Sequence, residues 1–239
     1  MKDFKIIIKK NNKNLGIFKI YNINSGYGVI IGNSLRRVLL SSIYGYAINY
    51  FKIKGIKHEL SYIKGFIEDV PEIILNLKKI RFKLKNSKKK IKTEKINIKI
   101  NNKKNKIYAG EIEKYSKYFK IINKKLIICN KDEKAKFNIK IIVKKGKGYI
   151  ESENKPRYKD YIAIDSIYTP ILNVKYFIKQ IDNYNENIEK IDILRIEILT
   201  DSSIKPLKAL IKASKILIKN FNNLINKKQY FKIRETYKK

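Results

Sequence analysis

The sequence predicts a mixed α+β fold, and three features of its hydrophobic patterning carry that prediction. Short runs of Ile and Phe near the N-terminus are typical of strands, and apolar residues alternate with polar ones through much of residues 50–160. A helical period marks the segment that follows residue 33 and the segment that follows residue 206. The chain has 239 residues, enough for one or two domains with a buried core. Its high isoleucine content excludes disorder for most of the chain.

The first elements are two predicted strands and a helix. The strands cover residues 4–8 and 17–23, and a glycine-rich segment separates them from the helix. Asn33 has the side chain of a helix cap, so we expect the helix to begin there. Four residues then recur at helical spacing and form one stripe that we expect to be buried: Leu35, Val38, Leu39 and Ser42.

The opposite side of this helix carries an unusual combination of side chains. Arg36 and Arg37 flank Leu40, and they are two of only six arginines in the chain. Arginine on a helix surface is most often solvated, but an exposed leucine between two arginines is typical of a contact surface. This face therefore predicts a second, functional contact.

The middle of the chain is predicted to be mostly β. Apolar residues alternate with Asn and Lys in residues 96–100, and with Asn, Lys and Ile in residues 137–143, which is typical of half-buried strands. One helix is expected over residues 68–77, where acidic residues and Pro71 occupy the first turn. The stretch 78–106 holds 14 basic residues and one acid, and we interpret it as exposed strands and loops.

The last part returns to mixed structure. Residues 171–181 and 191–200 are predicted to be paired strands, and a long amphipathic helix begins at Pro206. Proline suits the first position of a helix because its missing N–H is not needed there. Lys205 and Lys208 place positive charge where the helix dipole disfavours it, and the sequence offers no compensation.

The net charge of +35 is open to two interpretations. Such a charge normally points to nucleic acid, because lysines on phosphates release counterions. A strong preference for Lys over Arg is also what codon drift in an A/T-rich genome leaves, and a reader of nucleic acid would be expected to keep arginine. We favour drift as the main source. No secretory signal and no apolar run of 18 residues is visible, so we expect a soluble intracellular protein without membrane contact.

Catalytic and cofactor motifs are weak. His58 is the only histidine, which argues against a Ser-His-Asp triad and a His-based metal site. Cys129 lies in an Ile-rich strand, where a buried inert thiol is the favoured interpretation. Gly26, Gly28 and Gly32 follow the spacing GxGxxxG instead of GxGxxG, so they predict a tight turn and not a dinucleotide site.

The densest acidic patch allows more than one interpretation. It comprises Glu59, Glu68, Asp69 and Glu72. These carboxylates could hold Mg²⁺, but placement at a helix N-terminus or on a protein-partner surface is favoured. Nothing in the sequence resembles an active centre.

Five segments, in order along the chain, strongly resemble the alpha subunit of bacterial and plastid RNA polymerase. They are GVIIGNSLRRVLLSS (28–42), IKGIKHELSYIKGFIEDVPEIILNLK (53–78), VKKGKGYI (143–150), IAIDSIYTPILNVKY (162–176) and IEILTDSSIKPLKALIKASKIL (196–217). The resemblance spans nearly the whole chain and ends with the long helix. The C-terminal domain with which many members bind promoter DNA is therefore not expected in this sequence.

The resemblance implies an assembly scaffold for transcription. Family members form homodimers that recruit the polymerase beta and then beta-prime subunits, so the complex is a nucleotidyltransferase that binds DNA although this subunit carries no catalytic residues. No cofactor is expected in this subunit, and the catalytic Mg is expected in beta-prime. The implied domains are a discontinuous dimerisation domain at 1–47 and 171–239, with two helices on a sheet, and an inserted mostly-β domain at 48–170. The implied location is the bacterial cytoplasm or, alternatively, the plastid stroma.

The resemblance also implies site residues, by position in the family's motifs. Contact with beta is implied for Arg37, Leu40, His58, Glu68, Asp69 and Glu72, and contact with beta-prime for Lys78 and Ile164. The expected dimer interface comprises Leu35, Val38, Leu39, Leu210, Ile211, Leu217, Ile218 and Phe221. No catalytic, cofactor or metal residue is implied.

Two departures from the family pattern and one alternative function accompany these expectations. The segment 181–192 lacks the family's usual arginines, which weakens any beta-prime contact nearby, and Ser203 stands where the family often has glycine, which predicts a strained or reshaped turn. The alternative is an independent, basic, ribosome-associated RNA-binding protein. Such a protein would be a monomer whose affinity for RNA falls steeply with salt.

Overall fold

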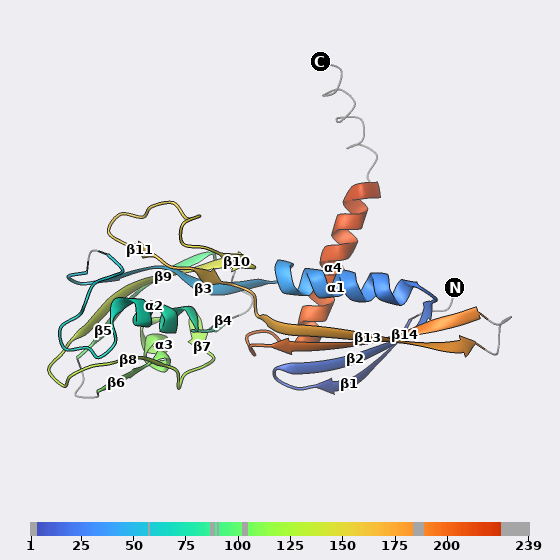
Figure 1. The fold of residues 1–239 in the computed structure, drawn as a ribbon, viewed down its shortest axis with the longest axis horizontal. Coiled ribbons are helices and arrows are strands. Elements are labelled where there is room, and N and C mark those ends of the chain that lie inside the picture. The colour runs from blue at the N-terminus through green and yellow to red at the C-terminus, as the bar shows by residue number, and fades with distance from the viewer. Residues whose placement is uncertain are drawn as a thin grey trace, which may run out of the picture. The chain divides into compact units, whose positions relative to one another are not determined.

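The computed structural model describes residues 4–56, 58–86, 89, 91–101, 105–183 and 189–225 (Figure 1). The chain divides into two compact units. The first unit comprises Met1–Ile43, Ile171–Thr200 and Lys205–Lys239, and the second comprises Tyr44–Pro170 and Asp201–Ile204. The resemblance places the first boundary at 47/48, whereas the structure places it at 43/44, because residues 44–47 belong to one continuous strand of the second unit.

The first unit is one antiparallel sheet with two helices. The strands run in the order β1 (Lys5–Asn11), β2 (Leu15–Asn24), β14 (Glu189–Thr200) and β13 (Ile171–Asn183). The helices α1 (Tyr27–Ser42) and α4 (Pro206–Ile225) contact each other and the sheet (Figure 1). Ile20, Ile23 and Leu194 form a buried cluster of this unit, and Ile31 of α1 packs against it. The predicted paired strands and the predicted start of the long helix at Pro206 are confirmed.

The predicted start of α1 at Asn33 is wrong. The helix begins at Tyr27, and Asn33 is an exposed residue inside it. Gly26 precedes the helix with a φ of 85°, a conformation that costs glycine little. The capping group is the carboxylate of Asp192 on β14, whose Oδ2 accepts the backbone N–H groups of Gly26 (2.9 Å) and Gly28 (3.0 Å). A cap that arrives from 164 residues away leaves no local signal in the sequence.

The second unit is built around a four-stranded antiparallel sheet. Its order is β11 (Ile162–Ala163), β3 (Tyr44–Ile53), β9 (Phe137–Lys147) and β5 (Thr93–Ile100). Three two-stranded ribbons accompany it: β4 (Phe82–Leu84) with β7 (Phe119–Ile121), β6 (Lys106–Tyr108) with β8 (Ile127–Asn130), and β10 (Tyr149–Ile150) with β12 (Ser166–Ile167). The helical elements are α2 (Val70–Lys78), η1 (Ala109–Glu111) and α3 (Ile112–Tyr115).

One hydrophobic core holds the second unit together, and its strand pattern was predicted. Ile96, Ile98 and Ile100 of β5 are buried, and so are alternate residues of β9 from Phe137 onward. Helix α2 contributes a buried face that includes Ile73. The structure places this helix over 70–78, close to the predicted 68–77, with its proline in the first turn.

Two predicted features lie partly outside the described residues. Within the basic stretch 78–106, residues 87, 88, 90 and 102–104 are not described; the lysines of β5 are exposed as expected. Within the segment 181–192, residues 184–188 are not described. At the turn before α4, the residue with positive φ is Ser202, at 70°, and not Ser203. Ser203 instead donates its backbone N–H and its hydroxyl to Asp201 Oδ1, at 2.8 and 2.6 Å.

Candidate functional site

The surface of α1 presents the two arginines that the sequence singled out. Arg36 and Arg37 are both exposed. Among the described residues, no side chain forms an ion pair or hydrogen bond with the Arg37 guanidinium. Its backbone carbonyl accepts a hydrogen bond from the hydroxyl of Ser41 at 2.9 Å. Leu40 was predicted to be exposed between the arginines, but the structure leaves it only partly accessible. Arg37 is therefore free to offer its planar, five-donor fork to a carboxylate.

The segment that leads into α2, together with α2 itself, exposes several large apolar side chains that the sequence analysis did not single out. They are Leu60 (80% exposed), Tyr62 (70%), Ile67 (78%) and Leu75 (53%). Single exposed apolar residues are ordinary, but four within 16 residues of one unit are typical of a surface that binds a partner. For Leu75, the signal that could have found it is its interleaving with the residues that α2 buries, whereas Leu60, Tyr62 and Ile67 precede the helix.

His58 lies in an exposed turn within the same segment. The hydroxyl of Ser61 donates to the backbone carbonyl of His58 at 2.9 Å and also lies 3.2 Å from its Nδ1. The imidazole thus has one local polar neighbour and remains accessible. This placement suits a surface contact.

The predicted acidic patch divides into different structural tasks. Asp69 caps α2, because its Oδ1 accepts the backbone N–H of Glu72 at 2.9 Å. Glu68 accepts two bonds from Asn130, one from the backbone N–H at 2.6 Å and one from the side-chain amide at 2.5 Å. Glu72 is exposed. Within the described ranges, no group of three or more His, Cys, Asp or Glu residues is arranged to hold a metal ion.

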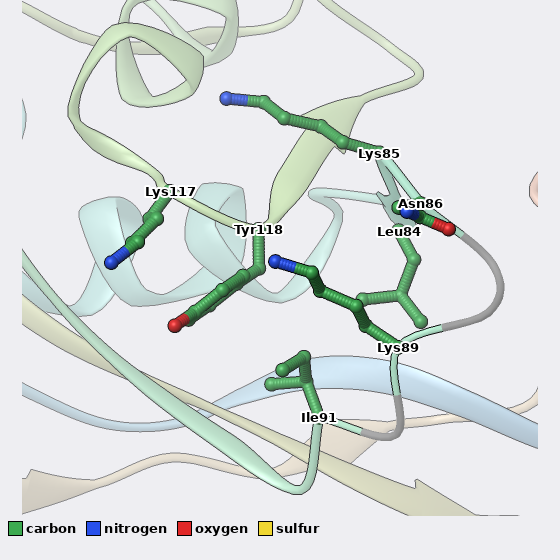
Figure 2. Close-up of a pocket in the computed structure, with 7 residues that line it drawn as sticks. All are labelled: Leu84, Lys85, Asn86, Lys89, Ile91, Lys117 and Tyr118. Atoms are coloured by element: carbon green, nitrogen blue, oxygen red, sulfur yellow. The ribbon is translucent and has the colours of Figure 1, made fainter.

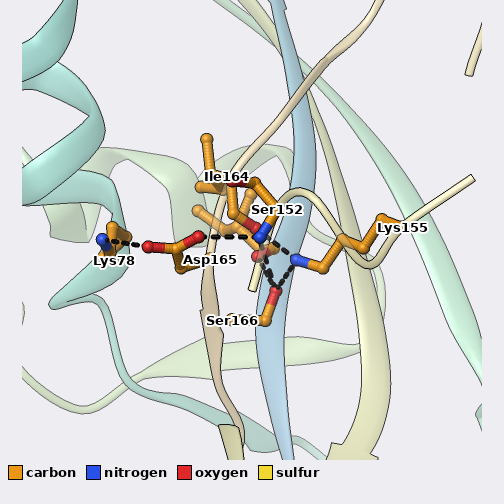
Figure 3. Close-up of polar contacts among 7 residues, drawn as sticks. Lys78, Ser152, Lys155, Ile164, Asp165 and Ser166 are labelled. Carbon is orange, nitrogen blue, oxygen red and sulfur yellow. Dashed lines mark hydrogen bonds and ion pairs between the residues drawn. The ribbon is translucent and has the colours of Figure 1, made fainter. Parts of the chain in front are cut away.

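Lys78 belongs to a polar cluster that ties α2 to the segment 152–166 (Figure 3). Its ammonium lies 2.8 Å from Asp165 Oδ2, and Asp165 Oδ1 accepts the backbone N–H of Ser152 at 2.7 Å. The hydrogen bond from Lys78 is the main cause that holds the pKa of Asp165 well below its usual range. The side chain of Lys78 is 20% exposed, so it remains partly accessible to a partner.

The backbone of Ile164 is fixed by the other half of this cluster. Lys155 donates to the carbonyl of Ile164 and to Ser166 Oγ, the latter at 2.6 Å, and Ser166 donates to the carbonyl of Ile48 at 2.7 Å. Burial lowers the pKa of Lys155 to about 8. The side chain of Ile164 is 2% exposed and packs in the core of its own unit. Ile164, for which the resemblance implies contact with beta-prime, thus lies close to Lys78 in the fold but not at the surface.

The residues expected at the dimer interface fall into two groups. Leu35, Leu39 and Leu210 are at most 6% exposed and belong to the interior of the first unit. Val38 and Leu217 are partly buried. Ile211, Ile218 and Phe221 are 48%, 58% and 56% exposed, and they lie along one stripe of α4. The second half of α4 is therefore apolar on a face that nothing in the described chain covers.

Two further features do not indicate catalysis. Cys129 is buried as predicted, and burial raises the pKa of its thiol to about 12, which leaves it protonated and inert. A shallow pocket of about 110 Å³ lies beside the Tyr118 ring, and its lining includes Lys89 and Lys117 (Figure 2). Their ammonium groups lie 5.6 and 5.7 Å from the ring centroid, within the range of cation–π attraction.

None of the described helices is long and apolar enough to cross a membrane.

Comparison with known proteins defines the class first. Residues 51–169, which lie within the second unit, match the RNA polymerase Rpb3/RpoA insert domain. The second unit thus contains this insert domain.

Relatives identify the kind of subunit. The chain is 44% identical over 223 residues to the DNA-directed RNA polymerase subunit alpha of Cytophaga hutchinsonii, and 42% and 41% identical over 221 residues to those of Flavobacterium psychrophilum and Phocaeicola vulgatus. Each match covers 91% of this chain and 65% of the relative. The chain belongs to the family of bacterial RNA polymerase alpha subunits, and it spans about two thirds of the length of these relatives.

Proposed function

We propose that the chain is the alpha subunit of a DNA-dependent RNA polymerase and that its homodimer nucleates assembly of the beta and beta-prime subunits. The uncovered apolar stripe of α4 is the observation that carries the proposal. Exposed Ile and Phe side chains on a helix of an otherwise strongly charged chain are costly in water, at about 25 cal/mol per Å² of apolar surface. A second copy of the same helix would cover them in a symmetric, self-complementary contact.

Recruitment of beta is assigned to two sets of residues. Arg37 supports it because its guanidinium is exposed and has no partner among the described side chains. The exposed apolar residues Leu60, Tyr62, Ile67 and Leu75 support it because they supply a hydrophobic contact in the segment that resembles the family's beta-binding motif. Glu68 and Asp69 act there through the fold, by fixing Asn130 and the start of α2, while Glu72 and His58 are accessible to beta itself.

Contact with beta-prime is assigned to Lys78, positioned by its ion pair with Asp165. Ile164 supports this surface through its fixed backbone, since its side chain is buried. The assembled enzyme binds DNA and joins nucleotides in the cytoplasm, with its catalytic Mg²⁺ held by beta-prime. This subunit supplies no catalytic group or cofactor.

The dimer is tested by sedimentation equilibrium of the full chain in 0.5 M salt. The wild type is expected to sediment with the mass of two chains. The double variant Ile218→Asp/Phe221→Asp places two charges in the stripe and is expected to sediment as a folded monomer. The control Lys219→Asp/Asn223→Asp changes two exposed positions on the other side of α4 and should remain a dimer. A wild-type monomer, or equal loss in both variants, would contradict the proposal.

Recruitment is tested by mixing purified alpha dimers with the beta subunit. Arg37→Ala is expected to leave the dimer intact and abolish capture of beta, because its bidentate fork is lost. Arg36→Ala is the matched control, since Arg36 is its exposed neighbour on the same helix. Retained capture by the Arg37 variant would remove this residue from the assigned site.

A further inference from the structure

The outward face of the main sheet in the second unit carries a cluster of lysines, which we call the lysine face: Lys52 on β3, Lys140 on β9, and Lys95 and Lys99 on β5. Side chains alternate along each strand, so the isoleucines between these positions enter the core. Lys95, Lys99 and Lys140 are exposed, and Lys52 is partly exposed. The lysines therefore share one solvent-facing surface.

The strand register crowds these charges together. Lys52 lies directly opposite Lys140, and Lys140 lies directly opposite Asn97. Lys95 and Lys99 are two residues on either side of Asn97, so both are diagonal neighbours of Lys140. Directly opposite residues have Cβ atoms about 5 Å apart and diagonal ones about 7–8 Å, and like charges at the opposite position are destabilising. Three positive charges, on Lys52, Lys95 and Lys99, thus lie around the positive charge of Lys140.

Acidic residues do little to neutralise this surface. Asp160 Oδ2 lies 3.2 Å from the ammonium of Lys52, but that carboxylate is 62% exposed. Within the described ranges, Lys95, Lys99 and Lys140 form no ion pair with a carboxylate. An anion bound here would relieve repulsion that the protein itself leaves uncompensated.

The sheet of the first unit gives several of its basic residues an acidic neighbour. There Lys175 lies opposite Glu197, and Lys190 lies opposite Asp182. Arg195 forms an ion pair with Glu197 at 2.5 Å. That sheet also places Arg195 opposite Lys19. Even so, Lys175, Lys190 and Arg195 each have a carboxylate opposite them or in an ion pair, whereas on the lysine face only Lys52 has one.

An aromatic group borders the lysine face. The ring of Tyr158 is tilted against Tyr50, with centroids 5.5 Å apart, and stands edge-on to Tyr161 at 5.2 Å. The residue is 38% exposed, and the ammonium of Lys95 lies 5.4 Å from its ring centroid. Single-stranded nucleic acid binds to surfaces that combine lysines with an accessible aromatic ring held in place by its neighbours. The lysines pair with phosphates and the ring stacks on a base.

We propose that the lysine face, with Tyr158, is a binding site for single-stranded nucleic acid. Phosphates occupy the surface around Lys140, and one base stacks on the exposed part of Tyr158. An acidic protein segment would use the charges alone, whereas the aromatic neighbour favours nucleic acid. The lysine face contains none of the residues assigned to dimerisation or subunit recruitment, so the two proposals succeed or fail separately.

The experiment measures binding of fluorescein-labelled oligo(dT) and oligo(U) of 20 nucleotides to the full chain by anisotropy, across a range of salt concentrations. The variant Lys95→Gln/Lys99→Gln/Lys140→Gln is compared with Lys106→Gln/Lys125→Gln/Lys134→Gln, which removes the same charge from exposed positions on other elements of the same unit. Tyr158→Leu tests stacking. Circular dichroism confirms that each variant is folded.

The lysine-face variant is expected to lower the slope of log K against log[salt] by about 2, since each neutralised phosphate of a single strand contributes ~0.7. The control triple should leave the slope close to that of the wild type. Tyr158→Leu should weaken binding about tenfold at constant slope, given ~1–3 kcal/mol for a stacked base. Equal losses in both lysine triples would overturn the proposal. So would displacement of the oligonucleotide by poly-glutamate at equal charge concentration together with no effect of Tyr158→Leu, which would assign the surface to an acidic protein segment.

Discussion

Removal of the Asp192 carboxylate tests how the first unit holds α1. Asp192 is 1% exposed, and its Oδ2 accepts the N–H groups of Gly26 and Gly28 at the start of the helix. Its Oδ1 has no hydrogen-bond partner among the described residues. One buried oxygen thus caps the start of α1 from a strand that is distant in sequence. The same helix carries Arg37.

The magnitude follows from the contacts that are lost. Asp192→Ala leaves two donors at the helix start without their acceptor, and each unsatisfied buried group costs about 1–3 kcal/mol. The favourable interaction of the carboxylate with the helix dipole, up to ~2 kcal/mol in partly buried geometry, is lost as well. The incompletely paired buried carboxylate opposes these terms in the wild type. We expect a net loss of about 2–4 kcal/mol in the free energy of unfolding.

Asp192→Asn is the matched variant, because an amide oxygen can still accept both N–H groups. It removes the charge alone, and we expect a loss of about 0.5–2 kcal/mol. The assay is urea denaturation of the full chain, followed by circular dichroism at a helical wavelength. A loss below ~0.5 kcal/mol for Asp192→Ala, or a larger loss for the Asn variant than for the Ala variant, would refute the reasoning.

Two further predictions concern the second unit. Gly45→Ala should unfold or strongly destabilise it, because the added Cβ would lie 1.9 Å from the backbone carbonyl oxygen of Tyr168; thermal unfolding measures this, and a wild-type midpoint would contradict it. Lys155 has a folded-state pKa of about 8, below its ordinary value of 10.5. Between these two pH values the folded protein binds fewer protons at Lys155 than the unfolded chain does. The free energy of unfolding should therefore rise with pH between about 8 and 10.5, at no more than ~1.4 kcal/mol per pH unit. Lys155→Met should flatten that rise in denaturation series at several pH values, and an unchanged slope would show that Lys155 does not cause it.

Much of the fold could be predicted from local patterns. The alternation of β5 and β9 places a row of buried apolar residues on one face and mainly lysine and asparagine on the other, and Asp69 followed by Pro71 marks the start of α2. These signals are local because a strand or helix end is specified by residues a few positions apart.

The missed features depend on residues far apart in the chain. The start of α1 needs Asp192. The burial of Glu94 needs the turn at residues 116–118, because the Glu94 carboxylate accepts hydrogen bonds from the hydroxyl and backbone N–H groups of that turn. The crowding around Lys140 depends on strand register, which a composition of 56 basic residues does not reveal. The site residues themselves came from resemblance, and their contacts with partner subunits stay predictions.

The most direct test of the scaffold proposal is to isolate the tagged chain from its own cells in about 0.5 M salt and to identify by mass spectrometry what remains bound. At that ionic strength the screening length is only a few ångströms, which removes most contacts that rest on phosphate alone. The proposal predicts two very large proteins, the beta and beta-prime subunits, in amounts of one each per pair of tagged chains. A lone chain that has released only RNA would contradict it.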